Sequence, residues 1–420
     1  MPQPAFGSSK QSKESTKSKT QPPDFTWRPI ILSLYGPALL FGQGQGAIIT
    51  VIALTAHQLG ASYAISGLIV TLVGIGLFVG NIPATLLVSK FGERSAMIAA
   101  SVFSALGMVF CLSALNLWIL GIGVLMQGVS TSVFNLARQA YMIQAVPFQL
   151  RARAFSVMGG VQRIGFFIGP FLAAPSMYFF DLSGAYYVGI LTISITIIFC
   201  YLAPELPAYE PAVCEKGKVV KPESSSGLLG MWQQTKAFKR LFLIMGTAVM
   251  LLTALRAVRP VILPLWAAHM AISPATMSLI FSVSSAVDMI VFYPAGKIMD
   301  EKGRGWVAIP CVTLLGLSFI LMAMSHSILG FVLAALLMGF ANGIGAGIVM
   351  TLGADYAPDS ARIEFLGVWR LITDSGHTIG PLMLSLLVMV TSLATGVFVT
   401  GLFGFLAGWV FIREFFLNKR

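Results

Sequence analysis

Long runs of apolar residues follow one another along this chain from Trp27 to Phe416, and mostly short polar stretches separate them. A helix rises about 1.5 Å per residue, so about twenty apolar residues are needed to cross about 30 Å of hydrocarbon. Twelve runs reach that length, and each predicts a membrane-spanning helix. The predicted spans are 30–55, 65–88, 95–115, 118–145, 154–178, 184–203, 240–264, 275–297, 306–325, 328–354, 365–390 and 394–413.

One long polar stretch, 204–239, divides the twelve predicted spans into two sets of six. It contains four prolines, a run of serines and several basic residues, a composition typical of a linker. The sequence therefore predicts an all-α integral membrane protein with two six-helix bundles, 29–203 and 240–414. Residues 1–28 and 415–420 are expected to be cytoplasmic tails, the first of them disordered because it is rich in Ser, Lys, Gln and Pro.

The composition supports this fold class, because 56% of the residues are hydrophobic and only 10% are charged, whereas about 25% are charged in soluble domains. The net charge of +11 follows from topology: all but five of the 27 Lys and Arg residues fall in segments on one side of the membrane. Cytoplasmic segments carry such an excess. We therefore expect both termini to be cytoplasmic, and we expect no nucleic-acid partner because the charges form no single water-facing patch.

The two halves of the chain repeat at a constant offset of 211 residues. The matched landmarks are Pro83 with Pro294, Gly92 with Gly303, Gly128 with Gly339, Pro147 with Pro358, Arg151 with Arg362, Gly169 with Gly380, and Pro170 with Pro381. Such a repeat predicts two similar bundles related by a pseudo-two-fold axis along the membrane normal. This arrangement is typical of proteins that bind a substrate between the bundles and carry it across by rocking.

A charged, glycine-containing loop pattern follows the second span of each half. Its residues are Gly296, Asp300, Gly303 and Arg304 in the second half, and Gly92 and Arg94 in the first. The first-half copy departs from the pattern, because Ser89 stands at the acidic position and Thr85 at the first glycine.

A second motif, of glycines and a proline, lies in the fifth span and repeats in the eleventh. Its residues are Gly165, Gly169 and Pro170, and then Gly376, Gly380 and Pro381. Small residues let membrane helices approach closely, so helix packing alone would account for this pattern.

With these motifs, the chain from Trp27 to Phe416 resembles the major facilitator superfamily of secondary transporters. The resemblance implies alternating access, with the two loop patterns acting in gating, and the fifth-span motif is similar to that of the exporting, antiporter branch. The family's central cavity is lined by spans one, four, seven and ten. On this chain those spans nominate Gln43, Gln45, Arg138, Arg256, Arg259 and Asn342 as cavity residues.

Seven ionised residues lie within the predicted spans: Arg138, Arg163, Arg256, Arg259, Arg370, Asp288 and Asp374. Exposing all of them to lipid would cost roughly 20 kcal/mol, so they must face water, protein or each other. Snorkelling to a membrane surface is an alternative for Arg259. Arg163 and Asp288 are predicted to lie at one depth. Because spans five and eight meet in the family, the resemblance implies an ion pair between the bundles.

Arg370, Asp374 and His377 are spaced to share one face of the eleventh span. A carboxylate whose access to water alternates can change protonation during transport. We therefore nominate Asp374, Asp288 and His377 for proton coupling, with a purely helical Arg370–Asp374 pair as the alternative reading.

The excess of arginine within the spans would concentrate anions. The sequence thus predicts proton-coupled efflux of a small organic anion or amphipathic compound by a monomer in a bacterial cytoplasmic membrane. An importing symporter, a facilitator, and a sensor or lipid-handling protein on the same fold remain alternatives. No enzyme activity, cofactor or metal site is expected, because no catalytic constellation or metal-ligand spacing is present.

Overall fold

The computed structural model describes residues 30–146, 148–202, 235–345, 347–358 and 362–417. Within these ranges the chain consists of helices joined by short turns. Twelve helical segments are long and apolar enough to cross a membrane. The predicted fold class and number of spans are therefore confirmed. The predicted N-terminal tail, residues 418–420 of the C-terminal tail and most of the linker lie outside the described residues.

The first half contains the six predicted spans. The first is divided into three helical segments, and the second and fifth run beyond both of their predicted ends. Its elements are the π-helical η1 (Ile31–Tyr35), α2 (Gly36–Ile49), α3 (Ile52–Gln58), α4 (Tyr63–Phe91), α5 (Glu93–Leu112), α6 (Leu117–Ala145), α7 (Phe148–Phe180) and α8 (Ser183–Leu202).

The second half repeats this order. Its elements are α10 (Lys239–Leu241), the π-helical η2 (Phe242–Gly246), α11 (Thr247–His269), α12 (Pro274–Lys302), α13 (Gly305–Ala323), α14 (Ile328–Ile344), α15 (Ile348–Tyr356), α16 (Arg362–Val390), α17 (Leu393–Ile412) and the π-helical η4 (Arg413–Leu417).

Helix caps extend the repeat beyond the residues noted in the sequence. Ser62 begins α4 and Ser273 begins α12, and each hydroxyl accepts a hydrogen bond from the backbone N–H three residues on. Asn116 and Ser327 cap α6 and α14 in the same way. Both pairs fall at the offset of the repeat. The two halves therefore begin their equivalent helices with the same local chemistry.

The tenth span differs from its prediction as one continuous helix. It divides into α14 and α15 at Gly345, and Gly347 has a φ of +83°. Glycine adopts this conformation without steric cost, so the run of glycines permits the break. Irregular backbone at membrane depth is tolerated where it is buried in protein or lines a cavity.

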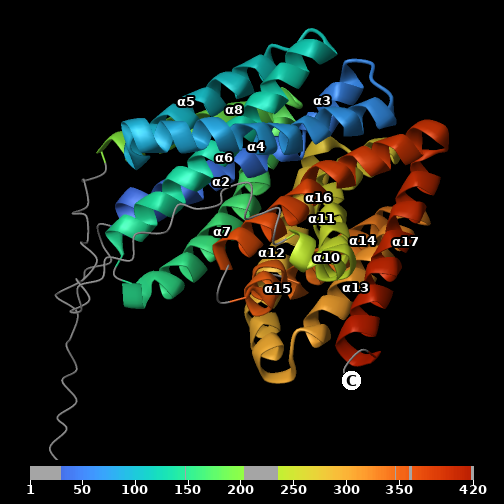
Figure 1. The fold of residues 1–420 in the computed structure, drawn as a ribbon. Coiled ribbons are helices and arrows are strands. Elements are labelled where there is room, and N and C mark those ends of the chain that lie inside the picture. Colours follow the sequence, from blue (N-terminus) through green and yellow to red (C-terminus); the bar gives the residue numbers. More distant parts are fainter. Residues whose placement is uncertain (1–29, 147, 203–234, 346, 359–361, 418–420) are drawn as a thin grey trace, which may run out of the picture.

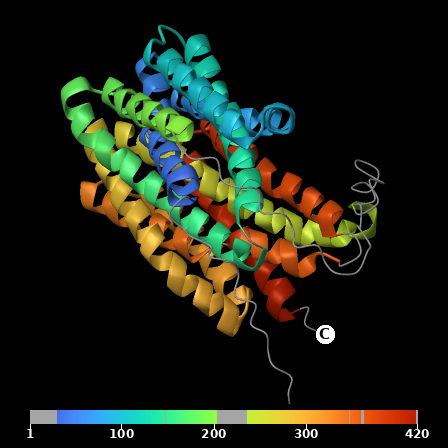
Figure 2. The same ribbon diagram turned by 90° about the vertical axis from the view of Figure 1, so that its left-hand side faces the viewer.

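The helices of each half gather into one group, shown in Figure 1 in blue to green and in yellow to red; Figure 2 shows the same grouping from a second direction. Two pairs of helices form the main contact between the groups: α7 packs against α12, and α4 packs against α16. The repeat makes α4 equivalent to α12 and α7 equivalent to α16. The two contacts are therefore equivalent to each other, as a pseudo-two-fold arrangement requires.

The bundles meet at mid-depth and on one side. We call the side where Ile30 and Leu417 lie the terminus side, and the opposite side the far side. On the far side, Ser278 donates to the Pro170 carbonyl at 2.9 Å, and the Tyr63 and His269 rings are 6.1 Å apart. The described polar and ring contacts between the bundles lie at these levels or at mid-depth. This arrangement corresponds to a state that is closed on the far side.

Candidate functional site

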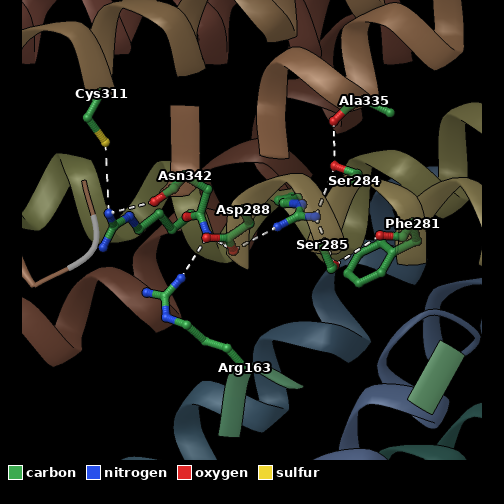
Figure 3. A network of polar contacts seen from close by, with 10 residues as sticks. Arg163, Phe281, Ser284, Ser285, Asp288, Cys311, Ala335 and Asn342 are labelled. Atoms are coloured by element: carbon green, nitrogen blue, oxygen red, sulfur yellow. Dashed lines mark hydrogen bonds and ion pairs between the residues drawn. The ribbon is translucent and has the colours of Figure 1, made fainter. Parts of the chain in front are cut away.

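Asp288 is the centre of a polar network between the two bundles (Figure 3). It lies in α12 and is 8% exposed. Arg163 of α7 donates from Nη1 to Oδ1 of Asp288 at 2.6 Å, so one ion pair joins the first bundle to the second. Asn342 of α14 donates from Nδ2 to Oδ2 at 2.6 Å. Nη1 of Arg259 lies 3.6 Å from the same oxygen.

Arg259 of α11 points into the protein and not toward a membrane surface. It is 6% exposed, and its Nη2 donates to the hydroxyls of Ser284 and Ser285 at 3.0 Å each. Its guanidinium also lies 4.9 Å from the centre of the Phe281 ring, which attracts a cation. These contacts, with the ion pair to Asp288, exclude the snorkelling alternative.

Arg256 lies one turn earlier in α11, beside the break in the tenth span. Its Nη2 donates to the Asn342 carbonyl at 3.3 Å and to Sγ of Cys311 at 3.8 Å. A Cβ on Gly345 would overlap both Cys311 and the Arg256 guanidinium. Among the described residues, no carboxylate lies within 4.0 Å of Arg256, and its buried Nε has no hydrogen-bond partner.

Arg138 of α6 is the corresponding unpaired arginine in the network of the first bundle, at a position that the repeat does not match to Arg256. It is 4% exposed, and its Nη2 donates to Asn135 Oδ1 at 3.1 Å and to Gln162 Oε1 at 3.0 Å. Within the described part of the chain, no carboxylate pairs with it, and Nε again has no partner. Gln162 precedes Arg163, so the surroundings of Arg138 and the ion pair between the bundles share one turn of α7.

The network carries an excess of positive charge. Four arginines and one aspartate belong to it: Arg138, Arg163, Arg256, Arg259 and Asp288. A buried charge is stable only with a partner and satisfied hydrogen bonds, and each missing partner costs several kcal/mol. A cluster with a net charge of +3 therefore favours the entry of anions.

The two glutamines predicted for the cavity have different surroundings. Gln45 is buried inside the first bundle, where its Nε2 donates to Ser104 Oγ at 3.0 Å and to Gln127 Oε1 at 2.9 Å. These bonds use both hydrogens of the Gln45 amide, so its side chain joins helices within the first bundle and has no donor left for a substrate. Gln43 is 7% exposed and makes no side-chain hydrogen bond to a described residue, which leaves its amide available.

The trio in the eleventh span lies outside this network. Arg370 Nε donates to Asp374 Oδ2 at 3.3 Å, but the two side chains are 61% and 46% exposed. His377 is exposed as well, and its side chain makes no hydrogen bond to a described residue. The Asp374 carboxylate is thus not enclosed by the protein in this state.

The glycines of the fifth and eleventh spans lie at close helix contacts within each bundle. A Cβ on Gly165 would come 2.6 Å from the Leu39 carbonyl of α2, and Gly169 and Pro170 follow one turn later. A Cβ on Gly376 would come 2.6 Å from the Met250 carbonyl of α11, and Gly380 and Pro381 continue that contact. The repeated motif therefore packs α7 on α2 and α16 on α11.

The second-half loop pattern forms ion pairs within its own bundle. Arg304 Nε lies 2.8 Å from Asp355 Oδ2 at the end of α15, and its Nη1 lies 3.2 Å from Asp300 Oδ1. The hydrogen bond and charge of Asp355 raise the pKa of Arg304 above its ordinary value. Gly303 has a φ of +100°, whereas Gly296 lies inside α12 with open space around it.

The first-half loop pattern uses backbone acceptors. Arg94 donates from Nε to the Cys200 carbonyl at 2.9 Å and also to the Tyr201 carbonyl. Gly92 has a φ of +78°, matching its repeat partner. Both loops thus tie the turn after the second span of a half to a later helix of that half.

Replacing Arg304 by glutamine should loosen the end of α15 without unfolding the protein. The Arg304 and Asp355 side chains are 28% and 44% exposed, and ion pairs with that exposure contribute about 1 kcal/mol or less. We expect faster amide hydrogen exchange at 348–356 with little change in thermal stability. Lys297→Gln, which removes an exposed pair inside α12, is the control. Unchanged exchange at 348–356 would contradict the prediction.

Several residues of the network were not selected from the sequence, namely Asn135, Gln162, Ser284, Ser285 and Phe292. The Arg163 guanidinium lies 5.0 Å from the centre of the Phe292 ring. The polar members carried a signal, because amide and hydroxyl side chains within apolar spans often bond across helices. No group of metal-ligating side chains is found among the described residues.

Residues 37–258 and 244–420 match the Major Facilitator Superfamily, so the chain belongs to this family. It is a multi-pass integral membrane transporter for a small molecule, and not an enzyme. Among curated proteins, none matches the sequence.

Solved structures of transporters share this fold. The nucleoside transporter NupG is 15% identical, with a TM-score of 0.69 and coverage of 92% of this chain and 99% of NupG. A bacterial homologue of the human lysosomal transporter Spinster, in an inward-facing and unoccupied conformation, is 14% identical; the TM-score is 0.76, and 95% of this chain and 99% of that chain are covered. The human organic anion transporter TETRAN is 16% identical, with a TM-score of 0.63 and coverage of 93% and 100%. At these identities the likeness concerns the fold alone.

Proposed function

We propose that this protein is a secondary transporter of a small organic anion that works by alternating access, with proton-coupled efflux as its direction. The observation that carries the anion is the network around Asp288, which contains four arginines from both bundles and one carboxylate. A neutral or cationic substrate would leave this charge uncompensated at each step of the cycle.

The Arg163–Asp288 pair supplies a contact that rocking must change. It joins α7 to α12 at mid-depth, where the two bundles pivot if the far side opens. A substrate anion that binds Arg163 competes with Asp288 for the same guanidinium, so binding and the contact between the bundles are linked. The side carrying both termini is the cytoplasmic side in this proposal, because the basic residues gather there.

Efflux is supported by the fifth-span motif at Gly165, Gly169 and Pro170, and monomeric function in a bacterial cytoplasmic membrane completes the proposal. In this scheme Asp374 exchanges protons with the water that reaches it in the state closed on the far side. Its 46% exposure supports access.

Symport of the anion with a proton is the second candidate, and the position of Asp288 favours it. Protonation of Asp288 would neutralise the charge that holds Arg163 and Arg259. The freed guanidinium groups would then bind a substrate anion, so proton and anion would bind together and not in competition.

The test is the internal pH of proteoliposomes while organic anions, cations and neutral amphiphiles are added outside. Exchange of an anion for protons makes the lumen more alkaline on addition of substrate, and symport makes it more acidic. Anion flux without a pH change indicates a facilitator. Saturable binding without flux indicates a sensor and overturns the proposal, as does movement of cations or neutral compounds alone.

Replacing Asp374 by asparagine should abolish the substrate-dependent pH change while anion binding persists, because the titrating carboxylate is removed. The variant should fold normally, since an exposed pair four residues apart in a helix contributes about 0.3–0.5 kcal/mol. Arg370→Gln is the matched control: it breaks the same pair but keeps the carboxylate. If both variants keep the pH change, Asp374 and Arg370 form only a helical pair.

A further inference from the structure

Two of the arginines in the network have no counter-charge, and they lie on opposite bundles. Arg138 belongs to α6 of the first bundle, and Arg256 belongs to α11 of the second. The carboxylate of Asp288 is already bound by Arg163, Arg259 and Asn342. The negative charge of Asp288 therefore compensates Arg163 and Arg259. The positive charges that lack a carboxylate partner are those of Arg138 and Arg256.

Both unpaired arginines bond to residues next to the Arg163–Asp288 ion pair, along the chain or through a hydrogen bond. On one side, Arg138 bonds to Gln162, the residue before Arg163. On the other, Arg256 bonds to the backbone carbonyl of Asn342, whose side chain bonds to Asp288. Each guanidinium is thus linked to the Arg163–Asp288 pair through one intervening residue, Gln162 on the first bundle and Asn342 on the second.

Their acceptors are weak for a buried guanidinium. Arg138 has two amide oxygens, and Arg256 has one carbonyl oxygen and a sulfur atom. In each case Nε is buried without a partner, although a guanidinium has five donors and matches a carboxylate through two of them. Nε of Arg259 is also buried without a partner, but Arg259 has the Asp288 carboxylate as its counter-charge. Arg138 and Arg256 combine an unmet Nε with the lack of any carboxylate partner among the described residues, and unmet donors are costly to an arrangement that serves only the fold.

We infer that the substrate carries two anionic groups, carboxylates in the simplest case, one bound by Arg138 on the first bundle and the other by Arg256 on the second. This inference rests on the proposed function and adds the number and placement of the charges. A dianion bridges the bundles in parallel with the Arg163–Asp288 pair. A monoanion satisfies only one bundle and leaves the other arginine unpaired.

The test compares linear dicarboxylates of three to eight carbons with monocarboxylates of the same length, for binding to the full-length purified protein. We expect at least one diacid to bind about 100-fold more tightly than its matched monoacid, because the monoacid leaves one of the two guanidinium groups without a charged partner. In Arg138→Gln and in Arg256→Gln this preference should fall below about tenfold, while the monoacid affinity of one of the two variants stays unchanged.

The melting temperature of the ligand-free protein gives a second readout. If Arg138 had only a structural role, Arg138→Gln would lower this temperature. An arginine whose counter-charge is supplied by a ligand destabilises the ligand-free protein. Arg138→Gln should therefore melt at the wild-type temperature or above it. Arg138→Lys keeps the charge and should retain part of the diacid preference. Arg413→Gln, which changes an arginine outside the network, is the control and should retain all of it.

The outcomes separate this inference from the proposed function. If the protein binds or transports matched monoacids and diacids equally well, the two-charge inference is overturned and anion transport is left intact. An unchanged diacid preference in both glutamine variants would overturn the assignment to Arg138 and Arg256. If no organic anion binds or moves and other compounds do, the proposed function fails, and the inference fails with it.

Discussion

Replacement of Asp288 by alanine should reduce transport by at least about 30-fold, the largest functional loss expected from a single side chain. Breaking a buried ion pair costs about 3–5 kcal/mol because the remaining charge loses its partner. Arg163 is 27% exposed on its side chain, so solvent screens part of this loss. An effect of about 2 kcal/mol corresponds to the 30-fold change. Arg259 and Asn342 lose their acceptor as well.

The measurement is the initial rate of substrate uptake into proteoliposomes at equal protein content. Glu301→Gln is the matched control, since it changes an exposed carboxylate on the same helix, α12. Asp288→Glu keeps the charge on a longer side chain and should recover part of the activity. Folding is followed by gel filtration in detergent. Uptake in Asp288→Ala within a few-fold of the wild type would contradict the central position of this carboxylate.

A double-mutant cycle would then isolate the contact between the bundles. If Arg163 and Asp288 act as one pair, the effects of Arg163→Gln and Asp288→Asn should not add, and the difference should reach about 0.5–3 kcal/mol. Additive effects would mean that the two residues act separately during transport.

Replacement of Gly169 by alanine should produce the largest loss of stability. A Cβ at this position of α7 would overlap the Gln43 carbonyl oxygen and lie 2.6 Å from the Ala47 nitrogen, both in the backbone of α2. Backbone atoms cannot turn aside as a flexible side chain can, so the two helices must move apart. Overpacking of this kind costs about 1–3 kcal/mol or more.

The measurement is thermal unfolding in detergent, followed by intrinsic fluorescence, together with the yield of monodisperse protein. Gly160→Ala is the matched control on the same helix, because nothing lies within 4 Å of a Cβ there. The repeat predicts a similar loss for Gly380→Ala, where the Cβ would overlap the Ala254 carbonyl. Equal melting temperatures for Gly169→Ala and Gly160→Ala would contradict the packing argument.

The glycine motif shows how one signal can serve both the fold and the transport cycle. Gly165 and Gly169 bring α2 against α7, and the following residue, Pro170, accepts the hydrogen bond of Ser278 from the other bundle. A change in this packing would therefore also move the far-side contact between the bundles. Close packing is by itself a sufficient physical reason for the glycines of this motif.

The sequence by itself determined the twelve spans, their division into two halves and the repeat. These features follow from local quantities, namely the length of each apolar run and the spacing of prolines, glycines and the arginine pair. It also identified every charge of the network, because an ionised residue inside an apolar span is conspicuous. Placing Arg163 opposite Asp288 needed the family resemblance in addition, since spacing along one chain does not say which helices meet.

Only the tertiary structure decided what each polar side chain contacts. Gln45 and Gln43 lie on the same helix two residues apart, yet Gln45 bonds to Ser104 and Gln127 while Gln43 makes no side-chain bond to a described residue. Asp288 and Asp374 are both intramembrane carboxylates, yet one is buried among arginines and the other is half exposed. Partners come from helices distant in the sequence, so their identity depends on how the bundles pack, and no local pattern contains that information.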